Sequence, residues 1–154
     1  MRGFLLALLL TLSAPAAADD VDMLLGAWIS PDGVTKCDYV REFDGSWVTT
    51  RMWFKVDEEW ELVAKGAMYQ RPGENLWRMV GRSKDMGGIV LFESTFEFLG
   101  DGKVKLVNTA FNADGTTRIA EEDWLVTADE IAYDIFDIEA GERVPLFSGK
   151  WLRM

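Results

Sequence analysis

The sequence contains no histidine, one cysteine and only 16 basic residues among 154. Histidine is the commonest general base, a frequent zinc ligand and the usual proximal ligand of haem, so its absence removes most sites of these kinds. The 26 acidic residues give a net charge of −10, which leaves no basic surface for nucleic-acid phosphates. We therefore expect no cofactor, no metal site and no nucleic-acid partner.

Long hydrophobic runs are also missing beyond the N-terminus, where a membrane span would need about 20 apolar residues. The N-terminus itself carries Arg2, a short apolar run over Phe4–Leu12 and small residues up to Ala18. This order predicts a signal peptide, residues 1–18, that is cleaved after Ala18. We expect residues 19–154 to form a single domain without a membrane span, located in the periplasm or secreted.

The lone cysteine, Cys37, has no partner for an internal disulfide in an oxidising compartment. It alternates with Tyr39 and Phe43 on the more apolar face of its segment. We expect a buried, unreactive thiol, and an intermolecular bridge is the alternative.

Turn-forming residues, by contrast, are abundant and evenly spaced. Nine clusters rich in Asp, Asn and Gly separate segments of strand length, from Ser30–Gly33 to Gly141–Glu142. Such clusters supply the positive φ angles of tight hairpins, so nine turns predict ten strands. Only residues 20–25 suggest a helical turn.

The segments between the turns alternate between apolar and polar residues. In the segment 90–98, Phe92, Phe96 and Phe98 share one face, while Glu93 and Glu97 share the other. This period of two is typical of half-buried antiparallel strands. We predict an all-β, antiparallel up-and-down meander barrel of about ten short strands, because closure removes exposed sheet edges. A two-sheet sandwich is the alternative.

The first and last predicted strands carry a family resemblance. Gly26-x-Trp28 opens the first strand and Gly149-Lys-Trp-Leu-Arg153 closes the last one. This pattern resembles lipocalins and related calycin barrels, and the spacing of strands and tryptophans looks like their small bacterial members of unknown function. The resemblance implies that Trp28 plugs the closed end of the barrel, that Gly26 permits close approach, and that Arg153 packs across the Trp28 ring, with Arg143 as second choice.

Seven tryptophans and nine phenylalanines need an explanation. They either fill a wide interior or line a pocket for a small apolar or amphipathic molecule, since aromatic surface with a few polar groups is typical of such pockets. On the second interpretation the candidate ligand-binding residues are Trp60, Met68, Arg78, Phe92, Phe96, Trp124 and Tyr133.

The segment 47–56 has two contrasting faces. Val48 and Met52 share one face, and Trp47, Arg51 and Trp53 share the other. If the first face is the core, the second is a candidate interaction patch for a protein partner. If the second face points inward, Arg51 is a buried cation that needs an anionic partner. We favour the first orientation.

Isolated charged residues also fall among apolar neighbours, such as Arg78, Glu122 and Asp137. They either reach solvent near strand ends or point into the interior, where a buried charge must be matched by a partner. Three functions remain. They are an exported lipocalin-like barrel that binds an apolar ligand, a filled barrel that contacts a protein through Trp47, Arg51 and Trp53, and a carboxylate-based hydrolase or isomerase. A cavity above about 300 Å³ would favour the first.

Overall fold

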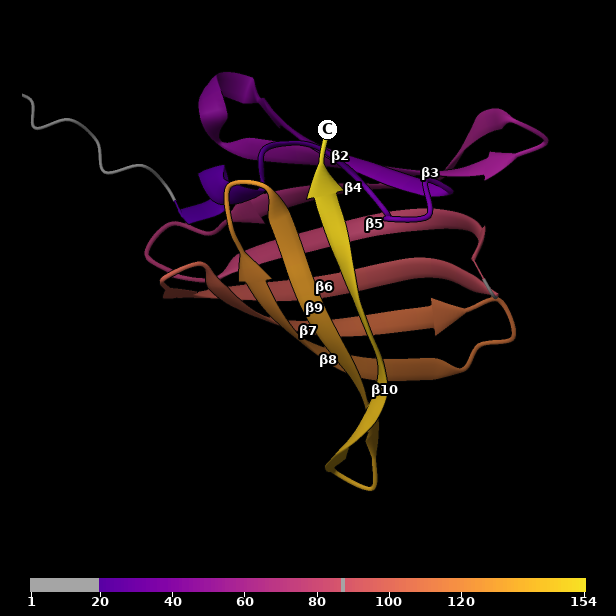
Figure 1. Cartoon of the computed structure of the whole chain (residues 1–154). Coiled ribbons are helices and arrows are strands. Elements are labelled where there is room, and N and C mark those ends of the chain that lie inside the picture. The colour runs from indigo at the N-terminus through magenta and orange to yellow at the C-terminus, as the bar shows by residue number, and fades with distance from the viewer. Residues whose placement is uncertain (1–19, 87) are drawn as a thin grey trace, which may run out of the picture.

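Ten antiparallel strands form one closed barrel in the computed structural model, which describes residues 20–86 and 88–154 (Figure 1). Each strand pairs with its neighbours in sequence, and β1 pairs with β10 to close the sheet. The predicted up-and-down barrel of ten strands is confirmed. The predicted signal peptide, residues 1–18, lies outside the described residues. Within the described residues, no helix has the length and apolar character needed to cross a membrane.

Two short 3₁₀ helices accompany the strands. The elements in order are η1 (Asp20–Leu24), β1 (Gly26–Ile29), β2 (Thr35–Glu42), η2 (Phe43–Gly45), β3 (Trp47–Val56), β4 (Glu59–Gln70), β5 (Trp77–Met86), β6 (Ile89–Gly100), β7 (Lys103–Asn112), β8 (Thr117–Val126), β9 (Glu130–Glu139) and β10 (Glu142–Arg153).

Tight hairpins set the strand order. In the β6–β7 loop, Asp101 and Gly102 have φ angles of 51° and 76°, the left-handed values that a two-residue hairpin requires. A Cβ atom at Gly102 would overlap the Val126 carbonyl oxygen, so this turn needs glycine for space as well as for conformation. Because successive strands reverse direction, the β3–β4, β7–β8 and β9–β10 loops lie at the end of the barrel opposite η1.

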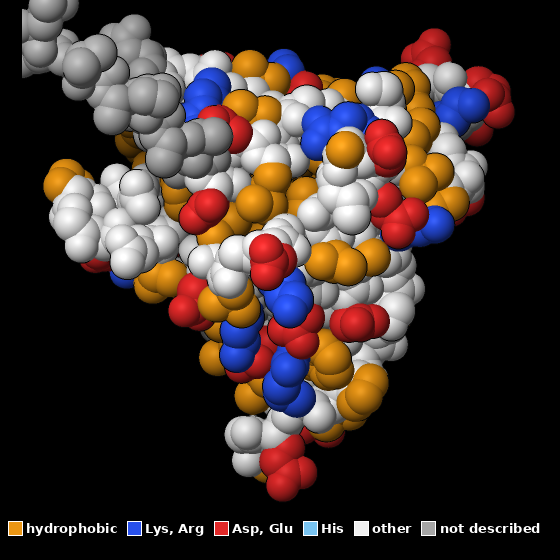
Figure 2. Space-filling view, turned by 60° about the vertical axis from the view of Figure 1, so that its left-hand side comes forward, with side chains coloured by type: hydrophobic (Ala, Val, Ile, Leu, Met, Phe, Trp, Pro, Cys, Tyr) orange, Lys and Arg blue, Asp and Glu red, His pale blue; other side chains and the backbone are white. Residues whose placement is uncertain are grey.

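The barrel wall separates two chemical environments. On the outside, Arg143 of β10 reaches across β9 to Glu121 and Asp123 of β8, at 3.1 and 2.7 Å, and Lys105 of β7 lies 3.4 Å from Glu121. Figure 2 shows acidic and basic side chains interleaved in this way over part of the surface. The inside is mainly apolar, and its fully buried residues include Val21 and Leu24 of η1.

The end of the barrel next to η1, which we call the closed end, is filled by large side chains. Trp28 is fully buried, and its Nε1 donates a hydrogen bond of 2.8 Å to the Leu24 carbonyl oxygen. Other buried side chains of this core are Val21, Leu24, Val48, Met68, Trp77, Phe96, Val104, Leu106, Val126 and Ile131. The helix η1 therefore seals this end.

Arg153 lies over the Trp28 ring, with its Cζ atom 4.0 Å from the ring centroid. Its Nη1 and Nη2 donate to the carbonyl oxygens of Leu25 and Met23, at 2.7 and 3.1 Å. A Cβ atom at Gly26 would lie 3.0 Å from Nη1, so glycine leaves room for the guanidinium. A guanidinium tolerates this partial burial because the ring and the carbonyl groups replace part of its water.

We predict that Trp28→Ala lowers the free energy of unfolding by about 3 to 5 kcal/mol, the usual cost of deleting a large buried aromatic side chain. Denaturant unfolding followed by circular dichroism measures this loss. The control is Trp47→Ala, because Trp47 is 38% exposed on the outer wall and its removal should cost much less. A loss below about 1 kcal/mol for Trp28→Ala, with the barrel intact, would contradict a structural role for the plug.

Candidate functional site

The barrel encloses a cavity of about 460 Å³. Aromatic side chains form much of its wall, and they are Tyr39, Phe92, Phe96, Trp124, Tyr133, Phe147 and Trp151. The wall between them is mainly aliphatic or sulfur-containing, with Met52, Ala64, Met79, Ile89, Leu106, Ala110, Ala120, Ile135 and Leu146. This volume and lining are typical of pockets for small molecules.

Two cross-strand pairs, each of an aromatic residue and a glycine, keep the cavity open. Phe92 of β6 is paired with Gly81 of β5, and a Cβ atom at Gly81 would overlap the Phe92 ring. Likewise Tyr133 of β9 is paired with Gly149 of β10, where a Cβ atom would lie 2.5 Å from the Tyr133 hydroxyl oxygen. Each ring lies against the glycine backbone of the adjacent strand, so it lines the wall of the barrel and leaves the centre of the cavity open.

A polar network crosses this apolar interior on three neighbouring strands. The Ser94 hydroxyl of β6 donates to Asn108 Oδ1 of β7, and Asn108 Nδ2 donates to Glu122 Oε1 of β8. The other carboxyl oxygen of Glu122 accepts a hydrogen bond of 2.7 Å from Trp124 Nε1. The strand register explains the contact between Ser94 and Asn108, because the two residues are directly paired across β6 and β7. Three donors thus fix a single carboxyl group, directly or in relay.

The interior shifts the pKa values of its ionisable groups upward. Burial raises the pKa of Glu122, although the hydrogen bonds from Trp124 and Asn108 oppose the shift. Burial likewise raises the pKa of Tyr39 and of Tyr133, and the negative charge of Glu122 adds to both shifts. Burial also raises the pKa of the Cys37 thiol to about 12. The cavity therefore disfavours a negative charge that has no positive partner.

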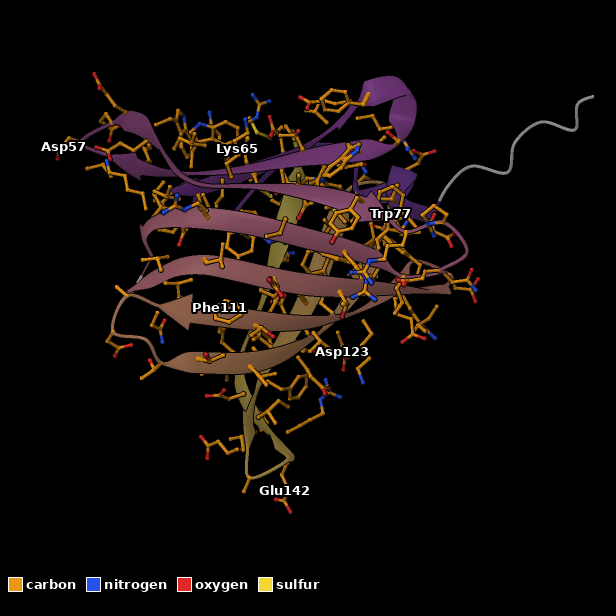
Figure 3. The ribbon with its side chains drawn as sticks, turned by 180° about the vertical axis from the view of Figure 1, so that it is seen from behind. Asp57, Lys65, Trp77, Phe111, Asp123 and Glu142 are labelled. Atoms are coloured by element: carbon orange, nitrogen blue, oxygen red, sulfur yellow. The ribbon has the colours of Figure 1, made fainter. Side chains whose placement is uncertain are left out.

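The cavity reaches solvent on the side of β10. Leu146 and Phe147 both line it and are 47% and 52% exposed. The β9–β10 hairpin extends beyond the rest of the barrel, with Glu142 close to its tip (Figure 3). Arg118 also borders the cavity, and its guanidinium forms an ion pair of 2.6 Å with Asp137. The solvent-exposed edge of the cavity is therefore formed by the apolar side chains of Leu146 and Phe147 and by the ion pair of Arg118 with Asp137.

Four of the seven candidate ligand-binding residues line the cavity, namely Phe92, Phe96, Trp124 and Tyr133. They come from β6, β8 and β9, and Phe96 and Trp124 make an edge-to-face contact with ring centroids 6.0 Å apart. Strand alternation is sufficient to place them on the inner face.

The other three candidates lie elsewhere. The Trp60 ring contacts Lys36, whose Nζ atom lies 4.4 Å from the ring centroid. A bulge shifts the β3–β4 register beyond Met52, and this shift changes which side chains of β4 point inward. Met68 faces inward but is fully buried in the closed-end core. Arg78 is on the opposite face from its inward neighbours on β5 and forms an ion pair of 3.0 Å with Glu74.

The residues Trp47, Arg51 and Trp53 make their side-chain contacts on the outer wall, while Val48 of the same strand is fully buried. Trp47 packs against Tyr69 with ring centroids 5.3 Å apart. The Arg51 guanidinium lies 5.3 Å from the Trp53 ring centroid and forms an ion pair of 2.6 Å with Asp38. This is the orientation that the sequence favours for the strand.

Several cavity residues were absent from the sequence-based candidates. Ser94 and Asn108 are polar residues on otherwise apolar strand faces, which is the only local signal that marks them. Glu122, between Ala120 and Trp124, was singled out by its charge as a residue that either reaches solvent or points inward, and it lines the cavity. Their contact depends on the register of β6, β7 and β8, which no single segment encodes.

Comparison of the sequence with protein-family models and with curated proteins finds no match. The geometry of the cavity is therefore the basis for a functional proposal.

We predict that the native Cys37 thiol reacts with a thiol reagent at least ~10-fold more slowly than the denatured protein, because only the thiolate attacks and its pKa of about 12 makes the thiolate scarce. Absorbance of the released reagent anion measures both rates. Fast labelling of the folded protein, or a disulfide-linked dimer on a non-reducing gel, would favour an exposed thiol.

Glu122 should give a characteristic pH dependence of stability. Its folded pKa lies above the ordinary value of 4.5, so the folded state holds the proton more tightly and this contribution to stability is lost as pH rises through the folded pKa. We expect the wild type to lose stability relative to Glu122→Gln as the pH rises from the ordinary value of 4.5 through the raised folded pKa. Urea unfolding of both proteins measures the difference, and a difference that stays constant with pH would contradict the shift.

Proposed function

We propose that this protein is an exported, lipocalin-like binding protein that holds a small, largely apolar ligand in the barrel cavity. The observation that carries the proposal is the cavity of about 460 Å³ with its aromatic and aliphatic lining. Small-molecule pockets commonly measure about 300 to 1,000 Å³ and combine such a lining with a few fixed polar groups. The network of Ser94, Asn108 and Glu122 supplies those polar groups.

The lipocalin-like assignment is supported by the closed barrel and by the packing of Arg153 over Trp28. Export to the periplasm or the cell exterior is supported by the sequence of residues 1–18 alone. Binding at such a site would give a carrier or a scavenger of its ligand.

The two other functions have less support. A protein-interaction module built on a filled barrel would need an interior without a cavity of this size. Hydrolysis by paired carboxylates would need a second acid in the cavity, and among the described residues that line it Glu122 is the only carboxylic acid.

Titration with phenylbutanol, a neutral probe with an aromatic body, tests the proposal. We expect a saturable change in tryptophan fluorescence, because Trp124 and Trp151 line the cavity. In Ala110→Phe a ring would occupy the cavity, and we expect affinity to fall roughly tenfold or more as the accessible volume is lost. The matched control is Ala132→Phe, since Ala132 alternates with the cavity residue Tyr133 and lies on the outer face of β9.

Circular dichroism and denaturant unfolding establish that both variants fold. No saturable signal in the wild type, or equal affinity in Ala110→Phe and Ala132→Phe, would contradict binding in the cavity.

A further inference from the structure

The Glu122 carboxyl group has no counter-cation. Two arginines border the cavity, but the Arg51 guanidinium lies on the outer wall with Asp38 and the Arg118 guanidinium is paired with Asp137, each at 2.6 Å. Within the described part of the chain, no lysine or arginine forms an ion pair with Glu122. A carboxylate deep in an apolar interior is costly unless a positive charge or several hydrogen bonds compensate it.

The Glu122 carboxyl group is the acceptor in both of its side-chain hydrogen bonds. Asn108 Nδ2 donates to one oxygen and Trp124 Nε1 to the other, while the Ser94 hydroxyl donates to Asn108 Oδ1 and thereby orients the amide. Each carboxylate oxygen can accept more than one hydrogen bond, so both keep a free lone pair. The network therefore holds Glu122 as a fixed acceptor with capacity left for a donor in the cavity.

The walls around this acceptor suit a cation. Trp124 and Phe96 stand edge to face, and π faces attract ammonium groups, more strongly when water is excluded. The ionisable groups that interact with Glu122 are Tyr39 from β2 and Tyr133 from β9, and Cys37 of β2 lines the same cavity. All three are uncharged when protonated, and burial favours that form, so they do not repel a bound ammonium ion.

We propose that the cavity selects ligands that carry an ammonium group on an apolar body, with Glu122 as the counter-ion. This inference depends on the proposed binding function and adds to it the chemical class of the ligand. An ammonium group supplies both the positive charge and the N–H donors that the carboxylate lacks. An alcohol supplies only a donor, and a carboxylate would place a second negative charge beside the first.

Three probes with one apolar body test the inference, namely phenylbutylamine, phenylbutanol and phenylbutyrate. Each is titrated at neutral pH and followed by tryptophan fluorescence and calorimetry. We expect the amine to bind roughly 10- to 100-fold more tightly than the alcohol, the range for a charge-assisted hydrogen bond, and the carboxylate to bind most weakly.

Two isosteric variants assign the preference to Glu122. Glu122→Gln removes the interior charge, and we expect it to lose the preference for the amine and to keep its affinity for the alcohol. Glu121→Gln is the matched control, because it makes the same change one residue earlier on the outer face, where Glu121 lies near Lys105 and Arg143. We expect Glu121→Gln to keep the preference.

The outcomes separate the two proposals. If the alcohol binds as tightly as the amine, or if Glu122→Gln keeps the amine preference, ammonium selection is overturned and apolar binding stands. Loss of alcohol and amine binding together in Glu122→Gln would mean that Glu122 shapes the cavity, and this too overturns the selection. If none of the three probes binds the wild type, apolar binding and ammonium selection both fail.

Discussion

The contact between Arg153 and the seam of the barrel is the interaction on which the rest of the structure depends. Strand β1 has only four residues, and its pairing with β10 involves Trp28 with Arg153 and Ile29 with Leu152. So short a ladder is weak by itself. Arg153 strengthens it, since its guanidinium stacks on Trp28 and donates to carbonyl oxygens of Met23, Leu25 and Ala128. Hydrogen bonds from a charged donor contribute about 1.5 to 3 kcal/mol, so one side chain joins η1, β1, β10 and the β8–β9 loop.

The number of strands in the closed barrel also determines how wide its interior is. Eight strands leave an interior just wide enough to be filled by side chains, so a ten-stranded wall has space to spare unless large residues occupy it. This protein places its large fully buried residues, such as Trp28, Met68 and Phe96, toward the closed end. Nearer the other end the inward positions include Ala64, Ala110 and Ala120, and the rings of Phe92 and Tyr133 lie over glycines. The cavity is therefore a consequence of where small residues fall in the inward register.

Local pattern was enough to predict the strands and turns and not enough to predict the site. Alternation within one segment identifies a face, which is why Phe92, Phe96, Trp124 and Tyr133 could be placed inside. It does not give height along the barrel axis, so Met68 belongs to the closed-end core instead of the cavity. It also fails across a bulge, as at Trp60.

The polar network shows a deeper limit of the same kind. Ser94, Asn108 and Glu122 come from three strands, and only the cross-strand register brings them together. A sequence read one segment at a time contains three isolated polar residues with no reason to interact. Alternation along β5 also misled the prediction for Arg78. Its apolar neighbours Leu76 and Val80 lie on the same outward face as Arg78, while Trp77 and Met79 face inward.

A buried acid in this position has a cost for the fold and a use for binding. Without a counter-cation, Glu122 is stabilised only by Asn108 and Trp124, and burial raises its pKa. Replacing such a group by an apolar one often stabilises a protein, so its presence needs a compensating interaction. The acidic surface, with a net charge of −10 for the chain, works in the same direction as the interior, because a negative field raises the local concentration of cations. Glu122 is the only acid among the described residues that line the cavity, so a cation that reached the cavity would meet a carboxylate without a positive partner. Its binding would offset part of the cost of burying that charge.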